Sequence, residues 1–418
     1  MKRLPVLSTH GEDGFSIHTI PFGYGIAGGK HPAALSAIAD QVVQLEVLAT
    51  NGLLPGFEET IKSCSNYGGL NPLIELGQER LGELRTMLQR LLQTGSELDD
   101  DRTLLAHATH PLNDTRMLLA VSFADYTDFY ASKYHAERVG AMFRGESNAL
   151  QPNWIHLPVG YHGRSSSIIP SGTNVTWPKG QLPGEDGPVY GPSQKLDFEL
   201  EFGCITAAGS ELGEPVKAGD AKELIGGYVL INDWSARDIQ AWEYVPLGPF
   251  TAKNFATSVS PWIIHPDALE PFRVEGPQAD AEPLPYLKQQ EPRHFDVKLD
   301  VWLHPAGSVT PFKLCTTNTR HLYWSMEQMI AHQTVTGCNI RPGDLYASGT
   351  VSGPEPENRA CLLELSENGK SPVEISPDIT RTFLQPGDEV IITGKAEKQD
   401  QDIVVNFGEV RSKVEEQK

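Results

Sequence analysis

Hydrophobic and polar residues follow one pattern up to about residue 118 and another after it. The clearest early pattern is helical and places four leucines on one face, Leu81, Leu84, Leu88 and Leu91. This spacing predicts a helix that ends near Gly95. The stretches 15–21 and 41–48 are typical of short β-strands among glycine- and proline-rich turns, and the acidic stretch 97–101 indicates an exposed connection.

After residue 118, short β-branched or aromatic runs alternate with glycine and proline, and the clearest helical pattern covers 322–334. The runs predicted to be strands are 174–177, 196–206, 226–232, 262–265, 295–303, 361–365 and 388–393. With 39 glycines and 31 prolines in the chain, this pattern indicates a mostly β domain with long loops, not a parallel α/β sheet. We therefore predict two domains, residues 1–118 and 119–418.

Composition excludes several classes of partner. Lys and Arg number 34 against 54 Asp and Glu, and the resulting net charge of −20 disfavours nucleic acid and anionic membrane surfaces. The start of the chain lacks the ~7–15-residue apolar segment of a secretory signal. No run reaches the ~18 apolar residues of a membrane span. The five cysteines are scattered without a CxxC pair, which favours reduced thiols and a cytoplasmic location.

One glycine motif is misleading. Gly23-Tyr-Gly25-Ile-Ala-Gly28 matches the dinucleotide-binding pattern, but His31-Pro32 follows where that motif needs a helix. We therefore do not predict nucleotide binding. The sequence also lacks GxSxG, HExxH and P-loop motifs, and its 13 histidines show no zinc-ligand spacing.

The stretch 196–202 alternates apolar residues with Asp197, Glu199 and Glu201. The alternation predicts a strand whose acidic side chains share one face. One interpretation is a half-buried strand with a solvated acidic face. The other is a divalent cation between the carboxylates, and ligation by oxygen alone suits Ca²⁺ or Mg²⁺.

Two further segments carry candidate chemistry. Asp233 follows the apolar run 228–232 and precedes Arg237 and Gln240, which is typical of a site at the end of a strand, although a helix-capping role worth ~1 kcal/mol explains it equally well. Upstream, Asp128 and three nearby residues offer a metal ligand, an orienting group, a general base and an anion clamp. The three are Tyr130, His135 and Arg144. An ordinary surface helix remains the alternative there.

Long ordered blocks give a more specific signal. They cover 125–130, 157–164, 232–240, 242–250 and 341–350. In these blocks the sequence resembles the fumarylacetoacetase family, from roughly residue 15 to near residue 410. The resemblance implies a small N-terminal SH3-like β-barrel domain, a larger β-roll domain and a homodimer.

The resemblance also implies a metal centre. Its ligands would be Asp128, Glu199, Glu201 and Asp233, holding Ca²⁺ or Mg²⁺. A second, structural Mg²⁺ is implied near Asp233, Lys253 and Thr257. For that ion the Lys253 backbone carbonyl is the sensible ligand, because a protonated amine has no lone pair.

Roles for further residues follow from the same resemblance. His135 becomes the base that activates water, oriented by Glu364 on the predicted 361–365 strand. The residues implied to form an oxyanion hole are Arg237, Gln240 and Lys253. Those implied to contact substrate are Tyr130, Arg144, Gln240, Tyr244 and Thr350.

The implied reaction is hydrolysis of a carbon–carbon bond in 4-fumarylacetoacetate, a dicarboxylic 1,3-diketo acid, to fumarate and acetoacetate. It is the last step of tyrosine and phenylalanine catabolism. A fumarylpyruvate hydrolase, a dienedioate isomerase or an oxaloacetate decarboxylase would share the acidic set, but these relatives generally lack the long N-terminal domain and the 242–250 loop. A non-catalytic, metal-stabilised scaffold would have no use for His135 or Glu364.

Overall fold

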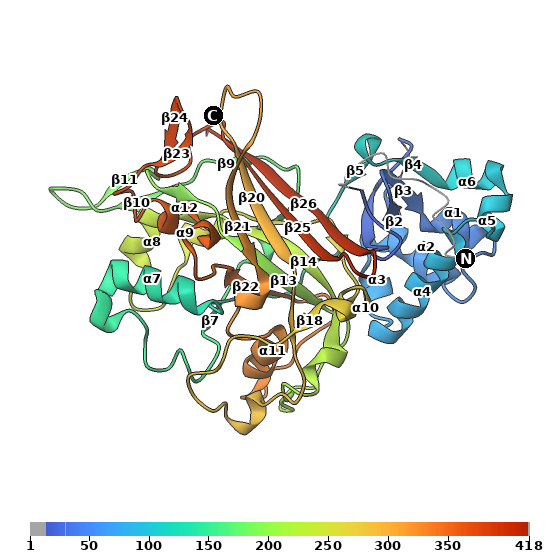
Figure 1. The fold of residues 1–418 in the computed structure, drawn as a ribbon, viewed down its shortest axis with the longest axis horizontal. Coiled ribbons are helices and arrows are strands. Elements are labelled where there is room, and N and C mark those ends of the chain that lie inside the picture. The colour runs from blue at the N-terminus through green and yellow to red at the C-terminus, as the bar shows by residue number, and fades with distance from the viewer. Residues whose placement is uncertain (1–13, 30, 417–418) are drawn as a thin grey trace.

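The chain forms a smaller N-terminal part and a larger, mostly β part (Figure 1). The computed structural model describes residues 14–29 and 31–416. The smaller part, blue to cyan in Figure 1, combines one sheet with several helices, and the larger part runs from green to red. Within the described residues, no helix has the length and apolar character needed to cross a membrane.

A six-stranded antiparallel sheet forms the β portion of the smaller part. Its strands are β1 Phe22–Ile26, β2 Ala33–Ile38, β3 Gln41–Gln44, β4 Thr109–Pro111, β5 Arg116–Met117 and β17 Trp262–Ile263. Strand β17 comes from the larger part, so the sheet links the two. The glycine motif lies on β1 and its following turn, where a Cβ on Gly23 would approach the Trp262 ring to 2.6 Å. Close packing between strands therefore explains this glycine.

Among residues 14–29 and 31–118, six α-helices accompany this sheet. They are α1 Leu45–Thr50, α2 Glu58–Tyr67, α3 Asn71–Ile74, α4 Gln78–Leu91, α5 Glu97–Asp100 and α6 Arg102–Ala108. The helix predicted from the leucine spacing is confirmed as α4, which buries all four leucines and ends at Leu91 rather than near Gly95.

Three predictions in this part were wrong. Residues 15–21 contain a single bridge, between Phe15 and Ala39, and the strand begins only at residue 22. The predicted strand 41–48 stops at residue 44, because the next residues bury Leu45 and Leu48 at helical spacing. The predicted exposed connection 97–101 contains α5, whose Leu98 is buried.

A seven-stranded mixed sheet forms the centre of the larger part. In spatial order its strands are β7 Gly160–His162, β6 Tyr126–Phe129, β22 Leu345–Thr350, β13 Leu200–Thr206, β14 Ile225–Asp233, β16 Thr257–Val259 and β8 Ile168–Pro170. The β6–β22 and β16–β8 pairs are parallel, and the other pairs are antiparallel. Strands from distant parts of the sequence thus become neighbours.

A second sheet packs against the first. Its five strands are β21 Phe312–Asn318, β20 Lys298–His304, β25 Glu389–Lys398, β26 Ile403–Glu415 and β9 Val175–Thr176. Phe202 of the first sheet stacks on Tyr228 at 5.2 Å and meets Phe407 of the second at 5.8 Å. The aromatic core therefore lies between the two sheets.

Short two-stranded ribbons complete the β structure. They are β10 Lys179–Leu182 with β11 Val189–Pro192, β12 Leu196–Asp197 with β15 Ser235–Ala236, β18 Arg273–Val274 with β19 His294–Phe295, and β23 Val373–Ser376 with β24 Ile379–Arg381. Six of the seven segments predicted as strands after residue 118 contain strands.

The helices of the larger part are α7 Lys133–Arg144, α8 Arg237–Glu243, α9 Thr251–Asn254, α10 Pro266–Leu269, α11 Met326–Thr334 and α12 Leu362–Leu365. The helix predicted within 322–334 is confirmed as α11. The predicted strand 361–365 was wrong, because it forms α12. The Asp197 carboxylate accepts the Leu362 and Leu363 N–H groups at 2.7 and 2.9 Å, which fixes the start of a helical turn despite the apolar run.

Gly140 allows close packing in the middle of α7. An added Cβ would overlap the Ala149 carbonyl oxygen, which already accepts a hydrogen bond from Arg144. We predict that Gly140→Ala lowers the free energy of unfolding by about 3 kcal/mol, because the backbone must move to admit the methyl group. Urea denaturation would measure this. Gly219→Ala is the matched control, since no described atom lies within 4 Å of its Cβ, and equal losses in both variants would contradict the explanation.

Candidate active site

Four acidic side chains meet inside the larger part. They are Asp128, Glu199, Glu201 and Asp233, all buried, each with an oxygen atom within 4.8 Å of the others. Asp128 lies on β6, Glu201 on β13 and Asp233 at the end of β14, while Glu199 immediately precedes β13. Because β6, β22, β13 and β14 are consecutive in the sheet, residues of one face converge. We call these four residues the acidic cluster.

Two basic side chains neutralise part of the acidic cluster. Lys253 Nζ lies 2.6 Å from Glu199 Oε2 and 2.7 Å from Asp233 Oδ2. Arg237 Nη1 donates to Glu199 Oε1 at 2.6 Å. Burial alone would raise the pKa of Glu199, but Lys253 and Arg237 hold that pKa well below its usual value. Glu199 is therefore an ionised and fully paired member.

Glu201 and Asp128 lack such compensation. Both carboxylate oxygens of Glu201, and Oδ1 of Asp128, are buried without a hydrogen-bond partner among residues 14–29 and 31–416. Burial and the charge of Asp128 raise the pKa of Glu201 well above its usual value, and burial and Asp233 do the same to the pKa of Asp128. Unpaired buried carboxylates are costly unless they ligate a metal. These oxygen atoms thus fit a hard divalent cation.

The side chains of the other two residues of the predicted second cation site, Thr257 and Lys253, both contact the carboxylate of Asp233. Thr257 is buried on β16 and donates its hydroxyl to Asp233 Oδ1 at 2.9 Å. The Lys253 amine is the ion-pair partner of Asp233 described above, as expected for a group without a lone pair. The second cation site itself stays a prediction.

A buried histidine–glutamate pair lies close to the acidic cluster. His135 occupies the first turn of α7, whose N-cap Ser132 accepts the His135 backbone N–H at 3.3 Å. Its Nδ1 lies 2.7 Å from Glu364 Oε2 on α12. Glu199 lies close enough to His135 for the two side chains to interact electrostatically, although Lys253 and Arg237 act on Glu199 more strongly. The imidazole is therefore held by one carboxylate and positioned near another.

Glu364 is kept ionised by the donors around it. Besides His135, Ser352 Oγ donates to Oε2 at 2.6 Å and Arg138 Nη1 donates to Oε1 at 3.2 Å. Burial alone would raise the pKa of Glu364, but these three partners lower it to about 2. An ionised Glu364 accepts the Nδ1–H of His135, and in the neutral imidazole this tautomer leaves the lone pair of Nε2 available to accept a proton.

Arg237 links several parts of the site. It begins α8, and its Nε donates to Asp197 Oδ2 at 2.9 Å while Nη1 also reaches Gln240 Oε1 at 3.2 Å. Its Nη2 is buried without a partner in the described part of the chain. The helix-capping alternative for Asp233 was wrong, because Asp233 belongs to β14 and the N-cap of α8 is Ala236.

Besides Gln240, four residues are predicted to contact the substrate, and their side chains differ in burial. Thr350 is buried next to Glu201 in the β13–β22 register, and its hydroxyl lacks a partner among the described residues. Tyr130 places its ring 5.3 Å from that of His135. Arg144 is exposed and donates to the carbonyls of residues 148 and 149, and Tyr244 packs its ring 6.3 Å from Phe143. Arg144 and Tyr244 therefore occupy the outer part of the region.

Sequence reasoning missed several polar partners. Tyr161 donates to Asp233 Oδ2 at 3.1 Å, and it lies in the 157–164 block without having received a role. Arg138 follows His135 by three residues on α7, a spacing that brings both to one helix face. Asp197 opened the acidic alternation but binds Arg237 instead of joining the acidic cluster. Ser352 gave no signal, because only folding brings it to Glu364.

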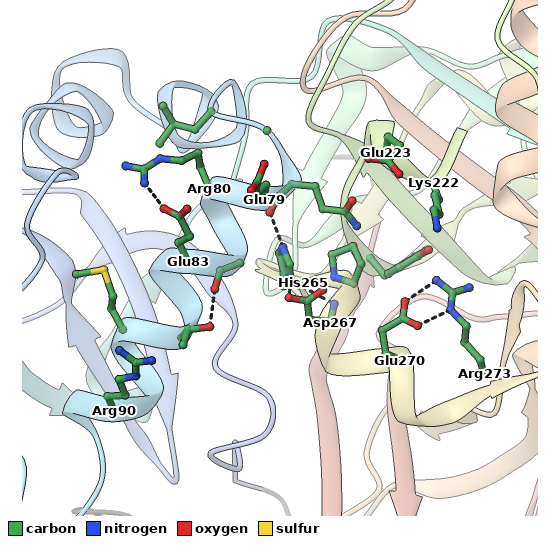
Figure 2. A pocket seen from close by; sticks show the side chains of 18 residues that line it. Glu79, Arg80, Glu83, Arg90, Lys222, Glu223, His265, Asp267, Glu270 and Arg273 are labelled. Atoms are coloured by element: carbon green, nitrogen blue, oxygen red, sulfur yellow. Dashed lines mark hydrogen bonds and ion pairs between the residues drawn. The ribbon is translucent and has the colours of Figure 1, made fainter. Parts of the chain in front are cut away.

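A separate cleft of about 950 Å³ lies between α4 and the segment that includes α10 (Figure 2). Its lining mixes cations such as Arg80 and Arg90 with acids such as Glu79 and Glu83, and Figure 2 shows His265 and Asp267 at its centre. None of its 18 lining residues, all within the described chain, belongs to the predicted site. The chemistry described above is therefore distinct from this cleft.

Comparisons with known proteins agree on one family. The family model "Fumarylacetoacetate (FAA) hydrolase C-terminal" matches residues 125–415, and "Fumarylacetoacetase N-terminal" matches residues 18–120. A fumarylacetoacetase of Bos taurus is 46% identical over 407 residues, which cover 96% of each chain. One of Oryza sativa subsp. japonica is 44% identical over 407 residues, covering 96% of this chain and 94% of the relative.

Among solved structures, a fumarylacetoacetate hydrolase from psychrophilic Exiguobacterium antarcticum superposes with a TM-score of 0.53 at 15% identity. The superposition covers 95% of this chain and 100% of that one. At this identity the similarity concerns the fold alone. It agrees with the mostly β architecture of the larger part.

The unpaired carboxylate of Glu201 leads to a testable prediction. In the presence of a chelator, Glu201→Gln should melt at a higher temperature than the wild type, because a glutamine of nearly the same volume avoids the cost of burying or protonating an unpaired carboxylate. With saturating Mg²⁺ or Ca²⁺ the wild type should gain more stability than the variant, because cation binding stabilises the folded state. Thermal unfolding with and without cation measures both effects.

A matched control is Glu327→Gln on α11. Glu327 is equally buried, and both its carboxylate oxygens lack a hydrogen-bond partner in the described residues, with Arg273 Nη1 3.9 Å from Oε1, but it lies outside the acidic cluster. The difference in melting temperature between Glu327→Gln and the wild type should not depend on the cation. A wild-type melting temperature that ignores both chelator and cation would contradict the metal site.

Proposed function

Since the chain belongs to the fumarylacetoacetase family, we propose that it hydrolyses the carbon–carbon bond of 4-fumarylacetoacetate to fumarate and acetoacetate, the last step of tyrosine and phenylalanine catabolism. The observation that carries this proposal is the buried His135–Glu364 pair beside an acidic cluster with unpaired oxygens. A scaffold protein would gain nothing from a base held in this way. The high coverage of curated fumarylacetoacetases supports the same reaction.

The cation is proposed to bind between Asp128, Glu199, Glu201 and Asp233 as Ca²⁺ or Mg²⁺. Bound there, it would supply Lewis acidity to an oxygen of the chelating 1,3-dicarbonyl. The protein positions these ligands with the sheet, while the Lys253 amine fixes Glu199 and Asp233. A second Mg²⁺ near Asp233, the Lys253 carbonyl and Thr257 is part of the same proposal.

His135 is proposed to act as the base. With its Nδ1–H hydrogen-bonded to Glu364, its Nε2 accepts a proton from water, and the hydroxide oxygen bonds to the ketone carbon of the fumaryl group. The carbonyl π electrons move to oxygen and return as the carbon–carbon bond breaks. The electron pair passes to the acetoacetate carbon, where the second carbonyl delocalises it as an enolate. The His135 imidazolium then returns the proton to that carbon.

The transient oxyanion needs donors aimed at it. We assign this role to Arg237, Gln240 and Lys253, and the Nη2 of Arg237 supports the assignment because it is buried without a hydrogen-bond partner in the described residues. Tyr130, Gln240, Tyr244 and Thr350 are proposed to contact the rest of the substrate. Because the chain carries a net charge of −20, the attraction of a dicarboxylate substrate must come from local cations. Arg144 is exposed, and we assign it the role of attracting the substrate at the entrance of the site.

The finer architecture and the assembly are also proposals. The N-terminal sheet and helices, residues 1–118, would correspond to the SH3-like β-barrel domain of the family, and residues 119–418 to its β-roll domain. A homodimer is supported by the 242–250 loop, which exposes Trp242, Val245, Leu247 and Phe250. Five unpaired cysteines, four of them buried, support a cytoplasmic location.

Removing the proposed base provides a direct test. His135→Ala should lower kcat by about 10²–10⁴-fold, because general-base catalysis contributes that much, while cation affinity and melting temperature stay near wild type. Stopped-flow or steady-state turnover together with cation titration measures these quantities. His332→Ala on α11 is a control that should keep full turnover, and wild-type turnover in His135→Ala would refute the base assignment.

The substrate and the cation can be tested in one assay. Loss of the absorbance of the conjugated substrate should be faster for fumarylacetoacetate than for acylpyruvate analogues. A chelator should abolish turnover, and Mg²⁺ or Ca²⁺ should restore it, because the acidic cluster needs a counter-ion. A preference for acylpyruvates would instead favour the fumarylpyruvate hydrolase alternative, and turnover that persists after chelation would contradict the cation's role.

A further inference from the structure

Asp197 is a completely buried carboxylate outside the acidic cluster. Both its oxygens are saturated with donors. Oδ1 accepts the backbone N–H groups of Phe198 and Leu362 at 2.9 and 2.7 Å, and Oδ2 accepts Arg237 Nε and the Leu363 N–H, each at 2.9 Å. A single side chain thus connects β12, α8 and α12.

The first connection fixes the guanidinium of Arg237. Asp197 holds Nε, and Glu199 and Gln240 hold Nη1. The guanidinium is planar and rigid, so these contacts also determine where Nη2 points. Because Nη2 is the guanidinium nitrogen left without a partner in the described chain, Asp197 determines the direction of the donor available to an oxyanion.

The second connection fixes the start of α12. The N–H groups of Leu362 and Leu363 are bound by Asp197, and the very next residue is Glu364. Glu364 in turn holds His135 Nδ1 at 2.7 Å. A shift of the first turn of α12 would therefore move the carboxylate that orients the proposed base.

We propose that Asp197 is a positioning residue that holds the oxyanion donor Arg237 and the base-orienting Glu364 in one fixed relation. The proposal rests on the proposed function, since it assigns Asp197 a part in the same reaction. Asp197 acts through its two neighbours and makes no contact with the substrate.

The chemistry of the position calls for a carboxylate. Four N–H donors converge on it, and an ionised carboxylate offers about four acceptor sites. An asparagine of the same shape has a single acceptor oxygen, and its NH₂ group would face two donors. Asp197→Asn should therefore release Arg237 or the start of α12 without changing the volume of the core.

The test compares Asp197→Asn with Asp388→Asn. Asp388 is equally buried and has similar partners, two nitrogens of Arg381 and the N–H groups of Ala306 and Gln385, but none of these partners belongs to the proposed site. We expect Asp197→Asn to lower kcat by roughly 10²-fold, the size of losing an oxyanion donor, with KM changed by less than about threefold. Asp388→Asn should lower the melting temperature comparably but leave kcat near wild type.

A double-mutant cycle with Glu364→Gln separates positioning from general stability. If Asp197 acts through Glu364 and Arg237, Asp197→Asn should cost less in the Glu364→Gln background than in the wild type. Three results would overturn the inference and leave the proposed function intact. The kcat losses of Asp197→Asn and Glu364→Gln could multiply in the double variant. Alternatively, Asp197→Asn and Asp388→Asn could lower kcat equally, or Asp197→Asn could keep the wild-type kcat. A wild-type protein that fails to cleave fumarylacetoacetate would refute the proposed function and the inference together.

Discussion

The central constraint in this molecule is the burial of more negative than positive charge at one place. Asp197 and the four residues of the acidic cluster bring five carboxylates into the interior, against the two cations Arg237 and Lys253. The cations are committed to Asp197, Glu199 and Asp233. What remains unpaired is concentrated on Glu201 and Asp128, whose orientations the sheet dictates. A hard divalent cation would resolve this imbalance, so folding and the proposed chemistry would depend on the same group.

The proposed base has a carboxylate of its own beside this excess charge. His135 and Glu364 come from α7 and α12, two helices that contact each other, and Glu364 has its own donors in Ser352 and Arg138. One carboxylate can therefore orient an imidazole while the others serve a cation. Asp197 joins the two systems, because it contacts both Arg237 and the helix that carries Glu364.

Part of this arrangement was predictable from local pattern. The leucine spacing identified α4, and the alternation predicted that Glu199 and Glu201 lie on one side of the chain, although β13 begins only at Leu200. Spacing could not show that Asp128 and Asp233 join them, because β6 and β14 meet β13 only through the strand order of the folded sheet. Their assignment came from the resemblance of whole sequence blocks to one family. The comparisons then confirmed that the chain belongs to this family.

Two of the errors have a common physical cause. The apolar run before Glu364 looked like a strand, but a distant carboxylate, Asp197, binds its N–H groups and starts α12. The acidic face of the 196–202 stretch looked solvated, yet Glu201 is completely buried. In both cases a tertiary contact overrode a local preference, and such contacts leave no trace in sequence periodicity.

The account depends most directly on where a divalent cation binds. Crystals soaked in Ca²⁺ or Mn²⁺ and measured for anomalous scattering would locate it. We expect one strong peak at coordinating distance, about 2.0–2.6 Å, from oxygens of Asp128, Glu199, Glu201 and Asp233. Crystals with an empty acidic cluster, or with the cation bound only elsewhere, would contradict the central claim.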